Sequence, residues 1–350
     1  QPVAQSLQIS VGAAGQSMTA YAMASALLAP MLLMGTGRWQ RKAALQLALA
    51  LFAGGMLLCA WAPDLQTLLV GRVLMGTGAV FTPIAASIAV AIVAPALRGK
   101  ALSITFLGMS LSYVIGLPLG AWFGLRFGWR VPTLAIAACT LVMLGLVSHR
   151  MPRRVDAPGA TLQGLGTVLR QGEVLRSLGL TLMYFSAIFT VFSYSGPVLL
   201  ALNPMGPEQL SLTLMLFGLA GVTGTLTGGW ANDRFGALPT LRCQLAVLSL
   251  MMLLVPLTAG SYLAMMLAFM VWGTAGFGMM APTQARLAGV SMHQAPVLFS
   301  LNTSMLYFGT AFGAALGGAA STTLGFAHLS WVGLCFALLG GLTFWRSGHN

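Results

Sequence analysis

The fold class follows from one charged stretch between two apolar runs, Gly228-Gly229-Trp230-Ala231-Asn232-Asp233-Arg234-Phe235-Gly236. Two opposite charges stand side by side between two apolar runs, each long enough to cross a membrane. Gly229, four residues before Asp233, predicts a close approach of two helix ends, because glycine carries no side chain. Gly236, three residues after Asp233, can adopt the positive φ that ends a helix. The stretch therefore predicts a short charged turn between two membrane helices.

The composition places the whole chain in a membrane. Hydrophobic residues make up 57% of the 350 residues and charged residues only 6%, whereas a soluble domain averages about 25% charged residues. Residues 1–15 are polar and small and are not expected to form a span. The expected spans are 17–35, 43–61, 67–94, 101–124, 131–148, 177–202, 210–230, 240–260, 262–285, 296–320 and 328–345. The prediction is an all-α membrane protein with five helices in a bundle over 1–148, a linker over 149–176 and six helices in a bundle over 177–350.

The net charge of +12 could suggest a nucleic-acid partner, but the placement of the basic residues argues against one. Loops that alternate across the membrane put fourteen of the 17 basic residues on one side: Arg38, Arg41, Lys42, Arg98, Lys100, Arg150, Arg153, Arg154, Arg170, Arg176, Arg234, Arg242, Arg286 and Arg346. The opposite side has Arg126 and Arg130, and Arg72 lies inside a span. Basic residues collect on the cytoplasmic side, so the C-terminus is expected there.

The sequence offers no metal site, cofactor motif or catalytic constellation. The cysteines lie in or beside apolar runs without a CxxC spacing: Cys59, Cys139, Cys243 and Cys335. The histidines lie far apart, at span ends or in loops: His149, His293, His328 and His349. No HExxH or GxSxG motif is present. We therefore expect no cofactor and no enzyme, with a membrane-embedded enzyme as the less favoured alternative.

The two halves repeat each other in one register. Gly116-Leu117-Pro118-Leu119-Gly120 matches Gly313-Ala314-Ala315-Leu316-Gly317 at an offset of 197, and Gly76-Thr77 matches Gly273-Thr274 at the same offset. Arg38-Trp39 matches Arg234-Phe235 at an offset of 196. A parallel repeat of this size predicts two related bundles. The span 177–202 has no counterpart after residue 1, so a twelve-helix carrier without its first helix is expected.

The Gly-x-x-x-Asp-Arg-x-Gly pattern around Asp233 resembles the short cytoplasmic loop motif of the major facilitator superfamily. Gly116 to Gly120 resembles the fifth-helix antiporter motif of that family, and Gln16 to Tyr21 its second-helix entry. Phe192 to Pro197 and Leu301 to Thr303 resemble its seventh and eleventh helices. The resemblance implies a drug or sugar efflux carrier of the twelve-helix proton antiporter group. It further implies a monomer in the bacterial inner membrane, a small-molecule substrate and a proton as coupling ion.

The resemblance assigns gating to the charged loops and helix packing to small residues. The gating residues are Arg38, Gly229, Asp233, Arg234 and Gly236. The first loop departs from the motif, with Gly37 in place of the expected Asp, Leu33 in place of the first Gly and Gln40 in place of the second. The packing faces are Gly108, Ser112, Gly116 and Gly120, with Pro118 able to bend that helix, and Gly309, Gly313 and Gly317. These faces either pack statically or form a seam that rocks during transport.

The candidate cavity residues are polar or aromatic positions inside spans: Arg72, Tyr21, Tyr184, Tyr194, Thr303 and Tyr307. A charge inside a span marks a pathway by default, although Arg72 could instead extend to the headgroups. The tyrosines and Thr303 either line the cavity or bond between helices. The acidic residues all lie in loops or at span ends: Asp64, Asp156, Glu173, Glu208 and Asp233.

We thus expect a secondary transporter that exports a small organic compound. In the resembled family the protonatable carboxylate commonly sits in the first helix, which this chain is expected to lack. A non-transporting membrane sensor or assembly protein of the same fold remains an alternative, since the first loop departs from the motif.

Overall fold

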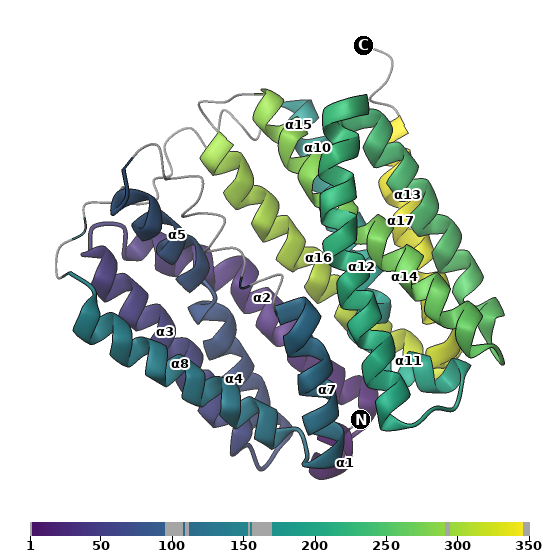
Figure 1. The fold of residues 1–350 in the computed structure, drawn as a ribbon, viewed down its shortest axis with the longest axis horizontal. Helices are drawn as coiled ribbons and strands as arrows, with labels where there is room; N and C mark the ends of the chain where they lie inside the picture. Colours follow the sequence, from purple (N-terminus) through teal and green to yellow (C-terminus); the bar gives the residue numbers. More distant parts are fainter. Residues whose placement is uncertain are drawn as a thin grey trace. The chain divides into compact units, whose positions relative to one another are not determined.

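The computed structural model describes residues 2–94, 108, 112–152, 155, 170–290 and 295–345. All regular secondary structure in these residues is helical (Figure 1). Eight of the described helices are long and apolar enough to cross a membrane, and the apolar helix Phe326–Leu342 is shorter. The predicted all-α membrane class is confirmed.

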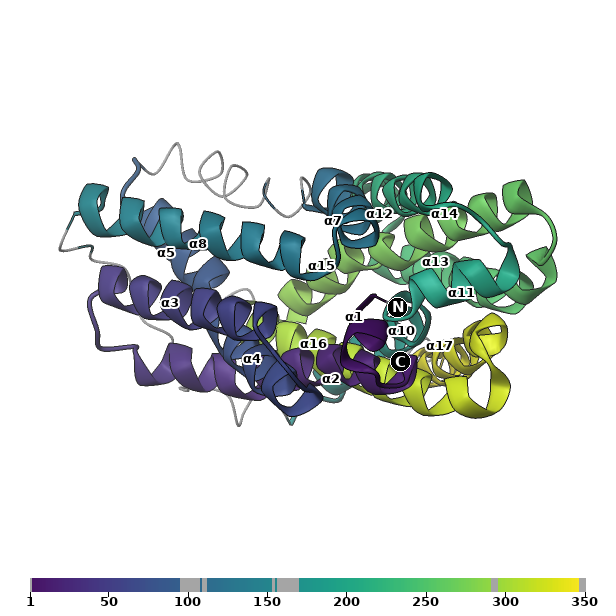
Figure 2. The ribbon, with the colours of Figure 1, turned by 90° about the horizontal axis from the view of Figure 1, so that it is seen from below.

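The chain divides into two compact units. The N-terminal unit is formed by Pro2–Ser112 and Phe123–Thr161, and the C-terminal unit by Leu162–Asn350 with Tyr113–Trp122 and Gln1. The helices of the N-terminal unit are α1 (Pro2–Leu7), α2 (Val11–Gly35), α3 (Arg41–Ala60), α4 (Leu65–Gly78), α5 (Phe81–Ala91) and α8 (Arg130–Arg150). In this unit α4 packs on α2 and α3, and α3 runs along α8 (Figures 1 and 2).

Side-chain caps fix where two of these helices begin. Ser10 Oγ accepts a hydrogen bond of 3.0 Å from Ala13 N, so α2 starts at Val11, six residues before the predicted 17. The prediction was wrong because it judged these small residues by polarity alone. Asp64 Oδ1 accepts from Thr67 N at 2.8 Å at the start of α4. This hydrogen bond lowers the pKa of the Asp64 carboxyl, since it favours the charged form.

The C-terminal unit contains eight of the described α-helices after residue 170. They are α10 (Gly172–Phe192), α11 (Ser195–Leu202), α12 (Pro207–Phe235), α13 (Ala237–Leu254), α14 (Tyr262–Gly278), α15 (Met280–Val290), α16 (Ala295–Leu324) and α17 (Leu329–Trp345). Within this unit α10 packs along α16 and α17, and α12 packs along α14. A π-helical turn (Ser112–Gly116) and α7 (Leu117–Arg126) follow residue 108 in the chain.

Three predicted spans are interrupted. The run 67–94 breaks at residues 79–80 between α4 and α5, and the run 177–202 breaks at 193–194 between α10 and α11. The run 262–285 breaks at Met279 between α14 and α15. Apolar composition continues across the breaks at 79–80 and Met279, so hydropathy could not locate them, whereas the break at 193–194 falls in the polar stretch Ser193-Tyr194-Ser195.

One pair of contacts agrees with the predicted internal repeat. A Cβ placed on Gly76 in α4 would meet the backbone oxygen of Tyr21 in α2. A Cβ placed on Gly273 in α14 would lie 3.3 Å from the backbone oxygen of Phe217 in α12. The glycines are 197 residues apart and their partners 196. The same glycine thus permits the same helix pair to approach closely in each unit.

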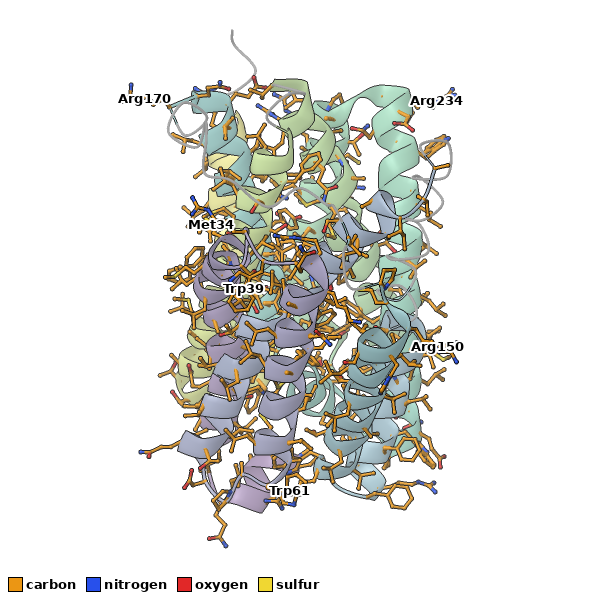
Figure 3. All side chains as sticks on the ribbon, turned by 90° about the vertical axis from the view of Figure 1, so that its left-hand side faces the viewer. Met34, Trp39, Trp61, Arg150, Arg170 and Arg234 are labelled. Carbon is orange, nitrogen blue, oxygen red and sulfur yellow. The ribbon has the colours of Figure 1, made fainter. Side chains whose placement is uncertain are left out.

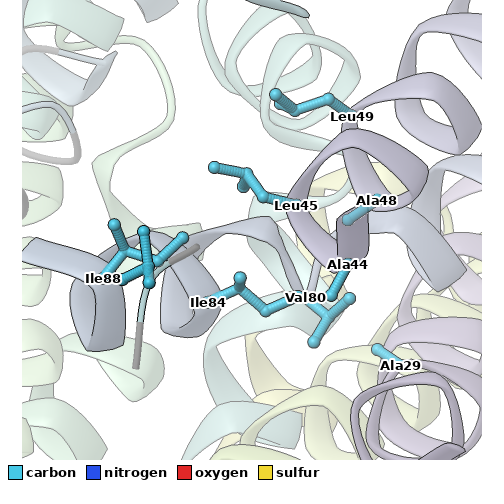
Figure 4. Close-up of a cluster of buried hydrophobic side chains, with 9 residues drawn as sticks. Ala29, Ala44, Leu45, Ala48, Leu49, Val80, Ile84 and Ile88 are labelled. Carbon is cyan, nitrogen blue, oxygen red and sulfur yellow. The ribbon is translucent and has the colours of Figure 1, made fainter. Parts of the chain in front are cut away.

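The two units have cores of different composition. In the N-terminal unit the small side chains Ala29, Ala44 and Ala48 are buried with Ile84 and Ile88 (Figure 4). Short side chains let α2, α3 and α5 approach, and the branched side chains fill the remaining space.

The C-terminal unit has an aromatic core. The ring centroid of Trp272 lies 4.8 Å from that of Phe217, with the rings tilted, and 5.1 Å from that of Phe269, with the rings edge to face. All three side chains are almost fully buried. Large rings supply more apolar area per residue than alanines do.

Exposed tryptophans mark the ends of α3. Trp39 precedes this helix and is 52% exposed, and Trp61 follows it and is 68% exposed. Figure 3 shows the two side chains at opposite ends of the helix. Tryptophan is enriched where a helix leaves the hydrocarbon for the headgroups, so this placement agrees with a membrane-spanning α3.

Candidate functional site

Arg72 lies in the middle of α4, inside the candidate span Leu65–Ala89. Its side chain is partly buried, and its Nε atom is buried without a hydrogen-bond partner among the described residues. One turn later, Gly76 holds α4 against α2, with Ala24 Cβ 2.8 Å and Ser25 N 3.1 Å from a Cβ built on the glycine. The Nε–H of Arg72 is thus a donor inside the span that is not used by the described residues.

The candidate Tyr21 of α2 packs beside the cluster of buried residues that includes Met56, Cys59 and Met75. Its side chain is partly buried. Thr19, two residues earlier, has a buried Oγ1 without a hydrogen-bond partner in the described part of the chain. This unbonded hydroxyl could not be predicted from the sequence, because a threonine in a membrane helix usually bonds to its own backbone.

The two candidate tyrosines of the C-terminal unit are buried. Tyr184 is 1% exposed, and its ring centroid lies 4.8 Å from that of Phe185. Tyr194 is 2% exposed, and its hydroxyl donates a 2.8 Å hydrogen bond to the Ala314 backbone oxygen on α16. Tyr194 was expected either to line the cavity or to bond between helices, and the structure shows the bond between helices.

The other two candidates of this unit lie on α16. Thr303 is exposed, and its hydroxyl donates to Phe299 O of its own helix at 2.9 Å. Tyr307, one turn further along, is partly buried. Thr303 and Tyr307 are therefore at least partly accessible, whereas Tyr184 and Tyr194 are buried.

The glycine face of α16 lies directly on α10. A Cβ on Gly309 would lie 2.5 Å from Leu182 O, one on Gly313 2.5 Å from Ser186 O, and one on Gly317 2.6 Å from Thr190 O. At such distances no larger residue fits without moving a backbone, which is the property expected of a packing face.

Two side-chain bonds flank this face. Thr181 Oγ1 on α10 donates to Asn302 Oδ1 on α16 at 2.6 Å, and both residues are buried. The Tyr194 hydroxyl makes the second bond, to Ala314 O. The α10–α16 seam therefore combines backbone contact with two specific hydrogen bonds.

The glycine face of the first half is different. A Cβ on Gly108 or Gly120 would meet no heavy atom of the described residues within 4 Å. Ser112 is exposed, and its hydroxyl donates to Gly108 O at 2.8 Å. Gly116 is also exposed and ends the π-helical turn, and Pro118 is the second residue of α7. Proline removes a backbone donor at that point, which explains the irregular turn just before it.

The second charged loop, which connects α12 and α13, is shorter than predicted. α12 continues to Phe235, so Asp233 and Arg234 lie in its last turn instead of in a loop. Gly236 alone separates the helices, with φ 84° and ψ 165°. This confirms the predicted positive φ, in a region that only glycine occupies readily.

The charges of this loop are exposed. Asp233 accepts a 3.2 Å hydrogen bond from Asn232 Nδ2, and the Arg234 guanidinium lies 5.7 Å from the centroid of the Phe235 ring (Figure 3). A Cβ on Gly229 meets no atom of the described residues within 4 Å, so the predicted close approach is not seen at this glycine there. The close approach falls on Gly228, where a Cβ would collide with the backbone of Gly278.

The first charged loop, residues 36–40 between α2 and α3, has a different construction. Arg38 is exposed, but Arg41 is 3% exposed. The Arg41 Nη2 atom donates to Thr36 O at 3.0 Å, to Trp39 O at 3.3 Å and to Gly37 O. A buried cation thus holds the backbone oxygens of the turn that follows α2, beginning with the C-cap residue Thr36.

Lys42 makes the equivalent contact with another helix. Its Nζ donates to Ser148 O at 2.7 Å and to Met151 O at 2.8 Å, at the C-terminal end of α8. Gln46 Nε2 adds a 2.8 Å bond to Ser148 Oγ. The start of α3 is therefore hydrogen-bonded to the turn after α2 and to the C-terminal end of α8. These contacts were not predicted from the sequence.

The comparisons with known proteins identify the family. The model described as Major Facilitator Superfamily matches residues 1–314, so the chain belongs to that superfamily. It is 29% identical over 351 residues to the inner membrane transport protein YdhP of Escherichia coli K12, covering 99% of this chain and 90% of that protein. It is 27% identical over 354 residues to a probable sugar efflux transporter of Pasteurella multocida, covering 99% and 87%.

Solved structures show the same fold. A bacterial homologue of the human lysosomal transporter Spinster, inward-facing and occupied, matches with a TM-score of 0.78 at 15% identity, over 99% of this chain and 90% of that one. The E. coli xylose transporter XylE matches with a TM-score of 0.72 at 16% identity, over 98% and 91%. The predicted family and fold are confirmed, and the chain is a membrane transport protein, not an enzyme.

Proposed function

We propose that this protein exports a small organic compound, sugar-like or drug-like, by alternating access. A relative that is named as a probable sugar efflux transporter supports the direction and the substrate class. The observation that carries the proposal is Arg72, whose buried Nε has no hydrogen-bond partner in the described residues. An intramembrane guanidinium is costly unless it serves a pathway, and it can donate to hydroxyl or carbonyl groups of a substrate.

Variants of Arg72 test the proposal in proteoliposomes loaded with a panel of sugars and lipophilic cations. Arg72→Ala should abolish flux of the exported compound while the protein remains folded, and Arg72→Lys should keep part of it. The exposed Arg38→Ala is the matched control for loss of one positive charge. Equal, near-normal flux in both Arg72 variants would show that this arginine only extends to the headgroups.

We propose that Thr303 and Tyr307 of α16, together with Tyr21, contribute further to the substrate cavity, whereas Tyr184, 1% exposed, does not reach it. Thr303 is exposed, and Tyr21 and Tyr307 are partly buried. Tyr194 is assigned to the α10–α16 seam instead, because its hydroxyl is bonded to Ala314 O.

Proton coupling is the proposed energy source, but no carboxylate of the described residues lies in the middle of a membrane span. The four described acidic residues all lie at helix ends: Asp64, Glu173, Glu208 and Asp233. A coupling group must gain and lose a proton inside the membrane, where burial raises a carboxyl pKa toward neutrality. We expect no substrate-induced proton movement by this 350-residue chain in proteoliposomes, and robust movement would refute the expectation.

The proposed arrangement is a monomer in a bacterial inner membrane with bundles 1–148 and 177–350, a cytoplasmic linker 149–176 and a cytoplasmic C-terminus. The fourteen-to-two distribution of basic residues between the two sides supports this orientation. Cysteines introduced as Gly37→Cys and Ala237→Cys should resist impermeant thiol reagents added outside intact cells. Ready labelling of either position would reverse the orientation.

A non-transporting sensor of the same fold is the second candidate. It is favoured by one observation, the absence of the motif's acid at Gly37. Flux in the proteoliposome panel separates the two functions, because a sensor binds its ligand without moving it across the bilayer.

A further inference from the structure

Three arginines and one glutamate form a charged cluster at one end of the C-terminal unit, where α15 lies beside α10 and α13 (Figure 1). The Arg286 Nε atom of α15 lies 3.4 Å from Oε1 of Glu173, which is in the first turn of α10. The charges of Arg176 on α10 and Arg242 on α13 also act on Arg286. We call these four residues the basic cluster.

The basic cluster carries more positive charge than its own acid can neutralise. One carboxylate, that of Glu173, stands against three guanidinium groups. The helices α10 and α13 both begin here, so their positive ends add to the imbalance. Arginine does not lose its proton in proteins, so the excess positive charge persists at every physiological pH. An anion at this place would relieve the repulsion between the arginines.

The excess charge is accessible to such an anion. Arg176 and Arg242 are exposed, whereas the side chain of Arg286 is only 10% exposed. An anion can therefore contact the guanidinium groups of Arg176 and Arg242 directly. Arg286, which is held by Glu173, contributes through its charge. Guanidinium groups pair well with phosphate oxygens, because their planar donors match the geometry of the phosphate.

The basic cluster lies at a membrane boundary. The helices α10 and α13 open the candidate spans Gly172–Phe192 and Ala237–Thr258, and Arg286 is the last residue but one of the candidate span Tyr262–Leu287. Lipid headgroups lie at the level where spans end, and basic sites between helix ends bind anionic headgroups there.

An exposed apolar face continues from Arg242 into the span. Ala246, Leu250 and Leu253 follow Arg242 at spacings of four, four and three residues, so all four share one side of α13. Ala246 is exposed, Leu250 is 50% exposed and Leu253 is 47% exposed. A cation next to an apolar face matches a molecule with an anionic head and an alkyl chain. A free phosphate ion would use only the charged part of this surface.

We propose that the basic cluster binds the phosphate group of an anionic phospholipid, with Arg176 and Arg242 as donors. One acyl chain lies along the face of α13 formed by Ala246, Leu250 and Leu253. The site belongs to one unit and does not depend on the proposed export activity.

Photolabelling of the full chain in phosphatidylcholine nanodiscs tests the proposal. The probe is a phosphatidylglycerol with a diazirine in one acyl chain, and a phosphatidylcholine with the same chain is the reference. The anionic probe should label α13 more strongly than the reference, and excess unlabelled phosphatidylglycerol should compete. Arg176→Gln and Arg242→Gln should each reduce labelling by the anionic probe about fivefold, which is the effect of one basic residue near an anionic lipid surface. Both variants should leave labelling by the reference unchanged.

Arg150→Gln is the matched control, since Arg150 is an exposed arginine at the end of α8 in the other unit. It should leave the labelling of α13 unchanged. Equal labelling of α13 by the two probes in the wild type would overturn the proposal. Labelling by the anionic probe that persists in folded Arg176→Gln and Arg242→Gln, or that falls equally in Arg150→Gln, would also overturn it. Displacement of the anionic probe by millimolar inorganic phosphate at constant ionic strength would overturn the assignment to a lipid, because it would show a site for a soluble anion.

Discussion

The two charged loops occupy equivalent positions in the internal repeat and are held by opposite means. In the first loop a buried arginine, Arg41, binds three backbone oxygens and Lys42 binds two more. In the second, Asp233 and Arg234 are exposed, and the turn rests on the backbone of Gly236. The loop without the family's acid is therefore the one whose side chains hold the helix ends.

The two loops thus separate two properties: the first holds the helix ends, and the second exposes a charged pair. Cations bonded to the carbonyl ends of helices can fix a loop without any carboxylate, because those ends carry partial negative charge. The second loop needs no such contacts, since Gly236 N donates to Asn232 O at 2.8 Å and Thr240 Oγ1 donates to Gly236 O at 2.8 Å. Its charged pair remains exposed.

The largest effect is expected from Arg41→Ala. Hydrogen bonds to a charged group contribute about 1.5–3 kcal/mol, and the variant leaves the backbone oxygens of the turn after α2 without their donor. We expect the free energy of unfolding to fall by about 3 kcal/mol in a titration with sodium dodecyl sulfate. Arg38→Ala removes the same charge from an exposed position and should change it by less than about 0.5 kcal/mol. Equal effects of the two variants would mean that the buried contacts are unimportant.

Gly236→Ala should have the next largest effect. An alanine at φ 84° and ψ 165° is strained by about 1–3 kcal/mol, so we expect a loss of about 2 kcal/mol in the same titration. Gly229→Ala is the control, because that glycine is helical and its Cβ would meet no described atom. Helical Gly→Ala substitutions are stabilising by about 0.5–1 kcal/mol. A matching loss in both variants would contradict the role given to the positive φ.

These two loops also show what a sequence reveals and what it conceals. The positive φ of Gly236 was predictable, because glycine is the usual residue where one helix stops and another starts at once. The role of Arg41 was not, since its partners are backbone oxygens and a basic residue there already has an explanation as a topology signal.

Helix rotation decides which of two adjacent glycines meets a neighbouring helix. Gly228 and Gly229 are adjacent, yet only Gly228 faces the backbone of α14. Successive helical residues point about 100° apart, so the partner of each depends on the rotation of the helix, which composition does not give. Similarly, the hydroxyl of Tyr194 was a plausible cavity group until its bond to Ala314 O was located.

A smaller effect is expected from Lys42→Met. The variant keeps the aliphatic stem but removes the donor to Ser148 O and Met151 O, so the last turn of α8 should fray. We expect a loss of about 1 kcal/mol and faster amide hydrogen exchange over the last turn of α8. Lys42→Arg retains a donor and should preserve most of the protection. Unchanged exchange in Lys42→Met would show that another group caps this helix.

The smallest effect on stability, and the sharpest test of the comparison, is expected from Asp233→Asn. Asp233 is exposed and lies in the last turn of α12, where the dipole of its own helix disfavours a carboxylate by about 0.3–1 kcal/mol. Neutralising it should therefore leave the unfolding free energy within about 0.5 kcal/mol of the wild type. We expect Asp233 to contact a neighbouring helix end in one closed state of the transport cycle, where a positive N-terminal end would stabilise its carboxylate. Substrate flux per folded molecule should fall clearly in this variant. Asn232→Ala, which removes only the local 3.2 Å bond to Asp233, should transport normally. If Asp233→Asn transports as well as the wild type, the exposed pair has no role in the cycle and the two loops differ only in how they are held.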